Sequence, residues 1–380
     1  KARNVPGLRV GKSGLEKSLE KDLIGTNSIQ RFEVNAYGKR INQIDYEEGQ
    51  KGKIIKLTID TEIQKFTSEL LKNKAGSISV MDIYTGEIIA MNSSPSFDPN
   101  LFLYGIDKNI WKEIINNPSK PLINKTISGL YSPGSTIKPL VAFSALENNV
   151  LKPNMKVKCE GKIEMYGQTY HCWREKGHGY MSLKNAIKQS CDIYFYEVAR
   201  LLGVDKLNLT AEKFGLGKKV LGEYFPNEKQ GIFPSTKWKK KAIGQNWYLG
   251  ETFITGIGQG YIQTNPLQLC LMTAQLANGG YKIYPRIDLK KNQDTVEQIK
   301  NKIQQMKKIS KEKDNSILKA TENFFGTKVK EYTPLYNNPE NIKFVLDGMF
   351  KSTNELYGTS YKSRIEDPKY QFAGKTGTSQ

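Results

Sequence analysis

The chain has 380 residues, of which 38% are hydrophobic, and this is enough to bury one large core or two modest ones. Its formal net charge of +19 comes mainly from lysines spread along the whole sequence, without a zinc finger, an RNA-recognition signature or a single basic stripe. We therefore expect a globular protein with no nucleic-acid partner, while attraction to an anionic polymer or membrane surface stays open. No run of about 18 apolar residues predicts a transmembrane helix within this sequence.

The first 50 residues are polar and predict too few elements for a core of their own. An amphipathic run up to Leu23 predicts a helix, and the alternation over 31–35 predicts a strand. The sequence begins at Lys1, and its last residues resemble the middle of a strand. We therefore expect a partial domain over 1–50, a second domain over 51–380, and a natural protein that continues beyond Gln380.

The rest of the chain predicts a mixture of strands and helices. A strand at 54–59 precedes a helix over 61–71, which Asp60 caps, and a hairpin of 77–82 and 87–91 follows. Later segments predict helices at 182–189, 193–202 and 267–277, an exposed helical insertion at 290–313 and an edge strand at 371–379. A hairpin followed by many helices is typical of an α+β fold with helices packed on a sheet.

A candidate nucleophile lies in the stretch 131–139, which leads directly into an apolar segment. Pro133 and Gly134 interrupt what precedes them, so Ser135 is expected in the first turn of a helix. Lys138 follows three residues later and therefore shares a helix face with Ser135. A lysine activates a serine when burial or positive charge lowers the pKa of its amine. Because this spacing also arises by chance, a capping serine with a solvated lysine is the alternative.

Two later motifs complete a pattern with Ser135 and Lys138. Ser190-Cys191-Asp192 lies where two predicted helices meet, and Lys375-Thr376-Gly377 lies in a stretch of small residues that a ligand can approach. The order of the three motifs resembles that of penicillin-binding proteins and serine β-lactamases.

This resemblance extends over most of residues 51–380. Segments 81–90, 94–100 and 256–260 are similar to the transpeptidase domain of the family, and 11–16 resembles the pedestal that precedes that domain in class B members. Asp192, where most relatives have asparagine, is similar to the penicillin-binding protein 2 branch. The resemblance implies an α+β, penicillin-binding/serine β-lactamase-like transpeptidase fold: an antiparallel sheet flanked by helices, an all-helical subdomain and a small N-terminal pedestal remnant.

The resemblance also implies a reaction, D,D-transpeptidation of peptidoglycan stem peptides through a serine acyl-enzyme that β-lactams block. Ser135 would attack, Lys138 would be the general base, and Ser190 would relay a proton with Lys375 nearby. Backbone N–H groups of Ser135 and Thr378 would form the oxyanion hole. The implied set is completed by Asp192 as a catalytic residue and by Thr376, Gly377 and Thr378 as substrate-binding residues.

Family membership implies partners and a location as well. The partners would be peptidoglycan stem peptides, β-lactam antibiotics, and the membrane-embedded glycosyltransferase and scaffold proteins of cell elongation. The protein would act at the periplasmic face of the bacterial inner membrane, held by an N-terminal transmembrane helix outside this sequence. Catalysis would need no cofactor. The alternatives are a β-lactam sensor, a β-lactamase-like domain and, from a different class, a non-enzymatic polyanion-binding envelope protein.

A metal site is the last prediction. Cys159, Cys172, His178 and Cys191 are separated by twelve, five and twelve intervening residues, which is unlike the spacing of zinc fingers. Outside the cytoplasmic membrane, three neighbouring thiols would leave one unpaired, whereas a structural zinc would protect all three. Some penicillin-binding protein 2 sequences look similar in having metal ligands here. The alternative is one disulfide with a buried thiol, and Cys270 is expected to be a simple buried thiol.

Overall fold

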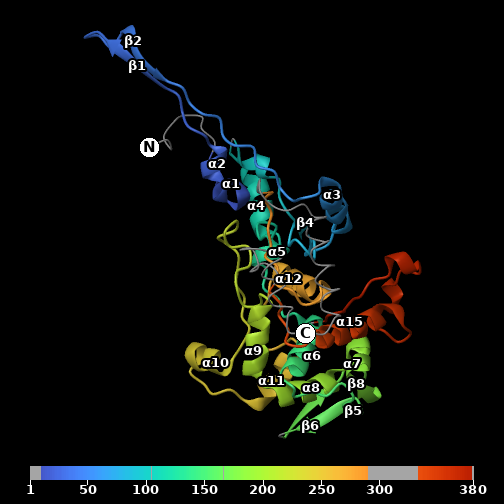
Figure 1. Ribbon diagram of the computed structural model, residues 1–380. Helices are drawn as coiled ribbons and strands as arrows, with labels where there is room; N and C mark the ends of the chain where they lie inside the picture. The colour runs from blue at the N-terminus through green and yellow to red at the C-terminus, as the bar shows by residue number, and fades with distance from the viewer. Residues whose placement is uncertain (1–9, 104, 166, 290–332, 379–380) are drawn as a thin grey trace.

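The computed structural model describes residues 10–103, 105–165, 167–289 and 333–378. At one end of the molecule, the hairpin of β1 (Ile29–Val34) and β2 (Arg40–Glu47) extends away from the other elements (Figure 1). Two short helices, α1 (Gly14–Ser18) and α2 (Glu20–Leu23), lie at its base. The amphipathic run up to Leu23 is thus two short helices, and the strand predicted at 31–35 is one arm of an antiparallel pair.

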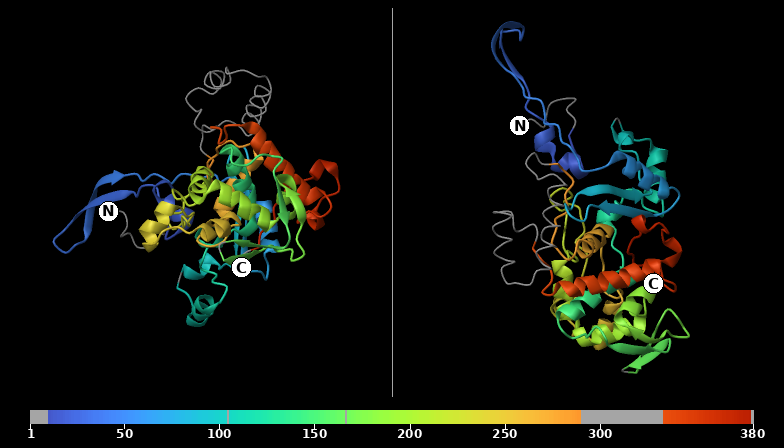
Figure 2. Two further views of the ribbon diagram at one scale, coloured as in Figure 1. Left: turned by 90° about the horizontal axis from the view of Figure 1, so that it is seen from below. Right: turned by 45° about the vertical axis from the view of Figure 1, so that its right-hand side comes forward.

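A two-stranded antiparallel sheet lies between the hairpin and the helical end of the molecule. Its strands are β3 (Gly76–Met81) and β4 (Ile88–Ser94), and they confirm the predicted hairpin. Helix α3 (Thr61–Leu70) packs against β4 and begins after Asp60, whose side chain accepts from the backbone N–H groups of Glu62 and Ile63. Helix α12 (Pro266–Ala277) packs against β3. The sheet is therefore flanked by helices, as the α+β prediction requires (Figure 2).

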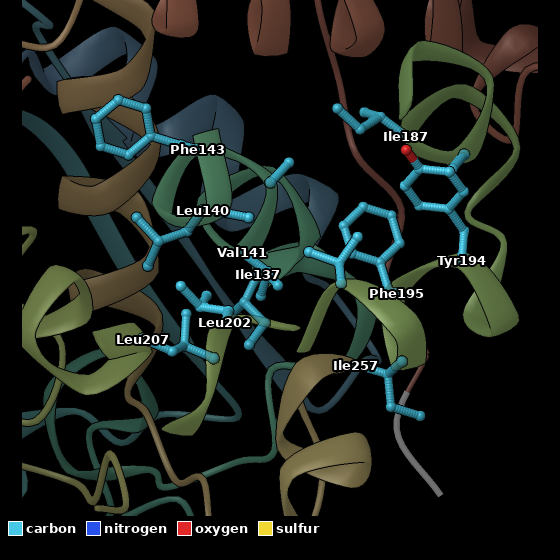
Figure 3. Close-up of a cluster of buried hydrophobic side chains, with 14 of the residues drawn as sticks. Ile137, Leu140, Val141, Phe143, Ile187, Tyr194, Phe195, Leu202, Leu207 and Ile257 are labelled. Carbon is cyan, nitrogen blue, oxygen red and sulfur yellow. The ribbon is translucent and has the colours of Figure 1, made fainter. Parts of the chain in front are cut away.

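The main core lies around α6 (Lys138–Glu147), in which every residue from Lys138 to Leu146 is buried. Helices α7 (Leu183–Gln189), α8 (Asp192–Leu202), α9 (Val204–Lys213) and α15 (Pro339–Asn354) pack around it, and α11 (Leu249–Gly256) packs on α8. Figure 3 shows Leu140 and Phe143 of α6 among apolar side chains of α7, α8 and α9. The ring of Phe143 also packs edge to face on that of Phe214, with the two ring centres 5.4 Å apart. A helix buried on all sides gives residues at its N-terminus a rigid support.

The remaining described elements are short. They are the helices α4 (Lys108–Asn116), α5 (Lys125–Ser128) and α10 (Thr236–Ile243), the 3₁₀ turns η2 (Pro99–Phe102), η3 (Gly134–Ile137), η5 (Tyr361–Ser363) and η6 (Pro368–Tyr370), and the strands β5 (Lys156–Cys159), β6 (Lys162–Met165), β7 (Gln168–His171) and β8 (Gly179–Ser182). Strand β5 pairs with β8, and β6 pairs with β7. Within the described ranges, no helix has both the length and the apolar character to cross a membrane.

Two predicted strands are wrong. Residues 54–59 make only one isolated bridge, from Leu57 to Asp288, because no described strand runs alongside the segment. Residues 371–378 belong to no strand, since they pair with no described strand and contact α15 through a bond from the Gly374 N–H to the Met349 carbonyl. The insertion predicted at 290–313 lies outside the described residues.

Candidate active site

Ser135 lies in the 3₁₀ turn η3, which runs directly into α6. The prediction of a helix start is correct, but the first turn is tighter than an α-helix. Gly134 has a φ of +54°, and a Cβ there would lie 2.3 Å from the Thr378 carbonyl oxygen. The Gly134 N–H donates to the Gly258 carbonyl at 2.8 Å, and a Cβ at Gly258 would lie 2.0 Å from the Gly134 oxygen. Both glycines therefore allow three distant segments to meet beside Ser135.

The Lys138 amine is fully buried and is held by the Ser190–Asp192 motif. Its Nζ donates to the Ser190 carbonyl at 2.9 Å, to Ser190 Oγ at 3.2 Å and to Asp192 Oδ1 at 2.7 Å. Three donors of a protonated amine are thus matched by three acceptors. Among the described residues no hydrogen bond joins this amine to the Ser135 hydroxyl, so the expected direct contact is absent from this state of the site.

Ser190 sits at the junction between α7 and α8 with φ 56° and ψ 40°, a left-handed conformation that is uncommon for serine. The following helix begins at Asp192, with Cys191 as its N-cap residue. This sharp junction turns the Ser190 hydroxyl toward two amines, because Lys375 Nζ donates to the same Oγ at 2.9 Å. Burial lowers the pKa of Lys375 well below that of a free lysine, the charge of Lys138 lowers it further, and Asp192 opposes the change.

The third predicted segment forms the opposite wall. Thr376, Gly377 and Thr378 line a cleft of about 630 Å³ together with Ser135, Ser190 and Asp192. A Cβ at Gly377 would lie 2.5 Å from the Thr136 methyl group, so glycine allows this segment to approach η3, the turn that carries Ser135. The structure therefore brings all the sequence-predicted catalytic and substrate-binding residues together, directly in the cleft or, for Lys138 and Lys375, through bonds to Ser190.

Among the cleft residues that were not predicted from the sequence, Thr359 and Trp173 bond directly to predicted site residues. The Thr359 hydroxyl accepts from the Thr376 hydroxyl at 2.8 Å, and nothing local in the sequence marks it. Trp173 donates its backbone N–H to Asp192 Oδ2 at 2.9 Å and its indole N–H to the Ser190 carbonyl at 3.1 Å. The feature of the sequence that could have indicated Trp173 is its position next to Cys172, a predicted metal ligand.

The four predicted metal ligands lie in one cluster. Cys159 ends β5, Cys172 follows β7, His178 precedes β8 and Cys191 precedes α8. Their ligand atoms all lie within 4.8 Å of one another, and His178 Nδ1 is 3.5 Å from the sulfur of Cys159 and of Cys172. Three thiols and an imidazole at these separations suit a tetrahedral zinc, for which neighbouring sulfur and nitrogen ligands are about 3.6 Å apart.

The loop geometry favours this cluster, and two of its three thiols, Cys159 and Cys172, have a lowered pKa. Gly177 has a φ of +72°, and a Cβ there would lie 2.2 Å from the Cys159 carbonyl oxygen, so only glycine allows the loop to fold back. The hydrogen bond from Cys191, assisted by His178, lowers the pKa of Cys172 to about 3. The same donor lowers the pKa of Cys159 to about 6, and the pKa of Cys191 is raised in return. Thiolates are the form of cysteine that binds metals.

Comparison with known protein families gives two matches. Residues 76–380 match the family described as Penicillin binding protein transpeptidase domain, and residues 2–57 match the Penicillin-binding Protein dimerisation domain. Among curated proteins, the Peptidoglycan D,D-transpeptidase MrdA of Acinetobacter baumannii is 35% identical over 73% of this chain and 42% of its own length. MrdA of Escherichia coli is 32% identical over 98% of this chain and 54% of its own length. The chain thus spans about half the length of these curated relatives.

Solved structures agree with the sequence matches. Pseudomonas aeruginosa PBP2, in complex with WCK 5153, superposes with a TM-score of 0.77 at 34% identity, covering 98% of this chain and 73% of that one. Helicobacter pylori PBP2, in a complex with MreC, gives a TM-score of 0.82 at 29% identity, covering 98% of this chain and 63% of that one. The penicillin-binding α+β fold is therefore confirmed. The boundary near residue 50 and the roles of the site residues stay predictions.

The lowered pKa of Lys375 predicts the pH above which the rate of acylation falls. A free lysine has a pKa of about 10.4, so Lys375 should lose its proton at lower pH. If the charged form is needed to attract a carboxylate, acylation by a fluorescent penicillin should be fast below this pKa and slow as pH rises through it. Lys375→Arg keeps its charge, so its decline should move to higher pH. The exposed substitution Lys237→Arg is the control, and an unchanged alkaline limb in Lys375→Arg would contradict the assignment.

Proposed function

The chain belongs to the class B penicillin-binding proteins, and from this we propose that it is the catalytic part of a peptidoglycan D,D-transpeptidase that forms a serine acyl-enzyme. The observation that carries the proposal is the convergence of Lys138 and Lys375 on Ser190 Oγ, at 3.2 and 2.9 Å, in the cleft that Ser135 lines. The names of the curated relatives support the same reaction.

In the acylation step, Ser135 Oγ attacks the carbonyl of the penultimate D-alanine and its proton passes to Lys138. An amine can accept this proton only with a free lone pair, whereas the protonated amine uses all three donors on Ser190 and Asp192. A neutral Lys138 keeps two donors, so one contact is released. The longest of the three, to Ser190 Oγ, is the one we expect to be lost. Its loss turns the lone pair of Lys138 toward the cleft.

Collapse of the tetrahedral intermediate expels the terminal D-alanine as an amine, which must gain a proton. Ser190 would deliver it, because Lys138, once it has taken the Ser135 proton, can donate to the Ser190 hydroxyl again, and this hydroxyl also contacts Lys375 and can pass on a proton from either amine. The backbone N–H groups of Ser135 and Thr378 would bind the developing oxyanion, and the close approach of Gly134 to Thr378 supports this role. The acyl group then passes to an amine of a second stem peptide, and Ser135 recovers its proton.

We propose a structural zinc bound by Cys159, Cys172, His178 and Cys191, and no cofactor for the chemistry itself. When bound, the metal would crosslink the loop 159–179 to the start of α8. Cys172 precedes Trp173, which donates to Asp192 and Ser190, and Cys191 lies between the two catalytic residues. The crosslink would therefore hold Ser190 and Asp192, the acceptors of the Lys138 amine, in position.

The location and macromolecular partners are also proposals. Peptidoglycan substrates lie outside the cytoplasmic membrane, so we propose action at its periplasmic face, with a membrane anchor outside this sequence. A scaffold protein and a membrane-embedded glycosyltransferase are proposed partners. Support comes from the H. pylori PBP2–MreC complex and from a structure described as a peptidoglycan synthase complex, which superposes with a TM-score of 0.72 at 28% identity.

Ser135 is predicted to be the acylated residue. Incubation of the 380-residue chain with a fluorescent penicillin should give one adduct, which peptide mass spectrometry should locate at Ser135. Ser135→Ala should reduce labelling by a factor of about 10³ or more, because no other group can form the ester. Ser132→Ala, three residues earlier in the same stretch, is the matched control and should label normally. Full labelling of Ser135→Ala would end the proposal.

Zinc is predicted at one equivalent per chain. Elemental analysis of protein purified without added metal should find it, and Cys159→Ser should lower zinc content, melting temperature and acylation rate together. Cys270→Ser is the control, since this thiol lies on α12 and contacts the Ser79 carbonyl. Less than about a tenth of an equivalent of zinc, together with a disulfide between two of the four ligands, would rule the site out.

A further inference from the structure

A second hollow, of about 690 Å³, adjoins the catalytic cleft. Tyr170 and Ile254 line both spaces, so the two lie side by side with this pair between them. The other walls come from β7, from α11 and from the turn after α11. These elements lie at the end of the molecule opposite the β1–β2 hairpin (Figure 1). None of the predicted catalytic, substrate-binding or metal-binding residues lines this second hollow.

The shape of the hollow is fixed by tight packing. A Cβ at Gly250 would lie 2.5 Å from the Tyr170 hydroxyl, so glycine lets the β6–β7 hairpin lie close to α11. Tyr170 is held edge to face by Phe253 and Tyr196, at 5.0 and 5.5 Å. The wall that separates the hollow from the catalytic cleft is therefore rigid, as a preformed binding site requires.

The hollow carries no net charge. Its acidic group, Glu251, binds Lys239 Nζ at 2.5 Å, and the lysine side chain is only 1% exposed. Lys239 also lies 4.5 Å from the centre of the Tyr248 ring and 5.9 Å from that of Tyr261. The buried cation is thus neutralised and enclosed, and it offers nothing to an ionised ligand.

Hydrogen-bonding capacity remains on two side chains. Glu251 Oε1 accepts from Lys239 and Tyr261, whereas Oε2 accepts from the Tyr248 N–H alone among the described residues, at 2.8 Å, and so keeps an acceptor site for a ligand. Gln168 Oε1 accepts from the Tyr170 hydroxyl, which leaves the amide N–H groups of Gln168 without an acceptor among the described residues. Tyr248 is 62% exposed, and the Lys239 ammonium lies over its ring at 4.5 Å from the centre, so the exposed part of the ring is the aromatic surface available to a ligand.

From this combination we infer that the hollow is a saccharide subsite, which binds an N-acetylhexosamine unit of the glycan strand. A sugar ring is neutral, its C–H face packs on an aromatic face, its hydroxyls donate to a carboxylate, and an acetamido carbonyl accepts from an amide. The ring of Tyr248 would pack on the C–H face of the sugar. Glu251 Oε2 would accept from its hydroxyls, and the amide of Gln168 would donate to the acetamido carbonyl. The inference rests on the proposed function, because a transpeptidase of peptidoglycan meets stem peptides attached to sugars, and the subsite lies directly beside the cleft.

The test uses a peptide-free oligomer of N-acetylglucosamine and the chain whose Ser135 is first blocked with penicillin. Saturation-transfer NMR should detect binding to the blocked chain. Tyr248→Ala should weaken it at least about tenfold through loss of stacking, whereas Tyr248→Phe should retain it. Tyr37→Ala, an exposed tyrosine on the distant β1–β2 hairpin, should bind as the wild type does, and circular dichroism should verify the fold of each variant.

Three results would overturn the subsite: no saccharide binding by the blocked wild type, equal binding by Tyr248→Ala, or binding of a sugar-free stem peptide in place of the oligomer. The last result would assign the hollow to the peptide of the second strand. Failure of the proposed function is seen separately, as absence of penicillin acylation in the unblocked wild type. Saccharide binding without acylation would support the saccharide subsite and contradict the proposed transpeptidase activity.

Discussion

The active site depends on one buried ammonium group. Lys138 is completely shielded from solvent at the start of α6, and all its donors are used on Ser190 and Asp192. Removing one partner of such a buried pair typically costs about 3–5 kcal/mol, since a charge is left unpaired. The arrangement of the α7–α8 junction, including the left-handed backbone of Ser190, therefore has to be maintained by the rest of the fold. In return, the same bonds join the start of α6, next to the turn that carries Ser135, to the Ser190–Asp192 motif.

Close backbone approaches assemble the cleft around this group. Gly134, Gly258 and Gly377 occupy places where a Cβ would clash with the facing chain, so segments more than 100 residues apart in sequence meet next to Ser135. The loop with the proposed zinc ligands works from the other side, because Trp173 bonds to both partners of Lys138. Positioning is thus divided between glycine contacts on one wall and, on the other, hydrogen bonds from the loop that holds the proposed zinc ligands. We therefore expect substitutions of these glycines or of Trp173 to slow acylation by displacing the site residues.

The sequence predicted those parts of the molecule that depend on local patterns. The hairpin of β3 and β4, the Asp60 cap and the helices around Ser190 follow from periodicity and capping, and the order of three short motifs indicated which polar residues meet. Strands 54–59 and 371–379 were wrong because a strand needs a partner that alternation alone does not supply. Thr359 could not be foreseen, since only tertiary packing brings it to Thr376. Nor could the second hollow, whose walls come from Gln168, Tyr248 and Tyr261 on separate segments.

The proposed role of Lys138, as the base that activates Ser135, is best tested with Lys138→Arg. Arginine keeps the positive charge for Asp192 and Ser190 but does not give up its proton near neutral pH. The rate constant of acylation by a fluorescent penicillin should fall by at least about 100-fold, the usual range for loss of a general base, while near-ultraviolet circular dichroism should show a folded protein. Acylation at close to the wild-type rate would mean that Lys138 is only a structural counter-ion of Asp192 and that another group removes the proton.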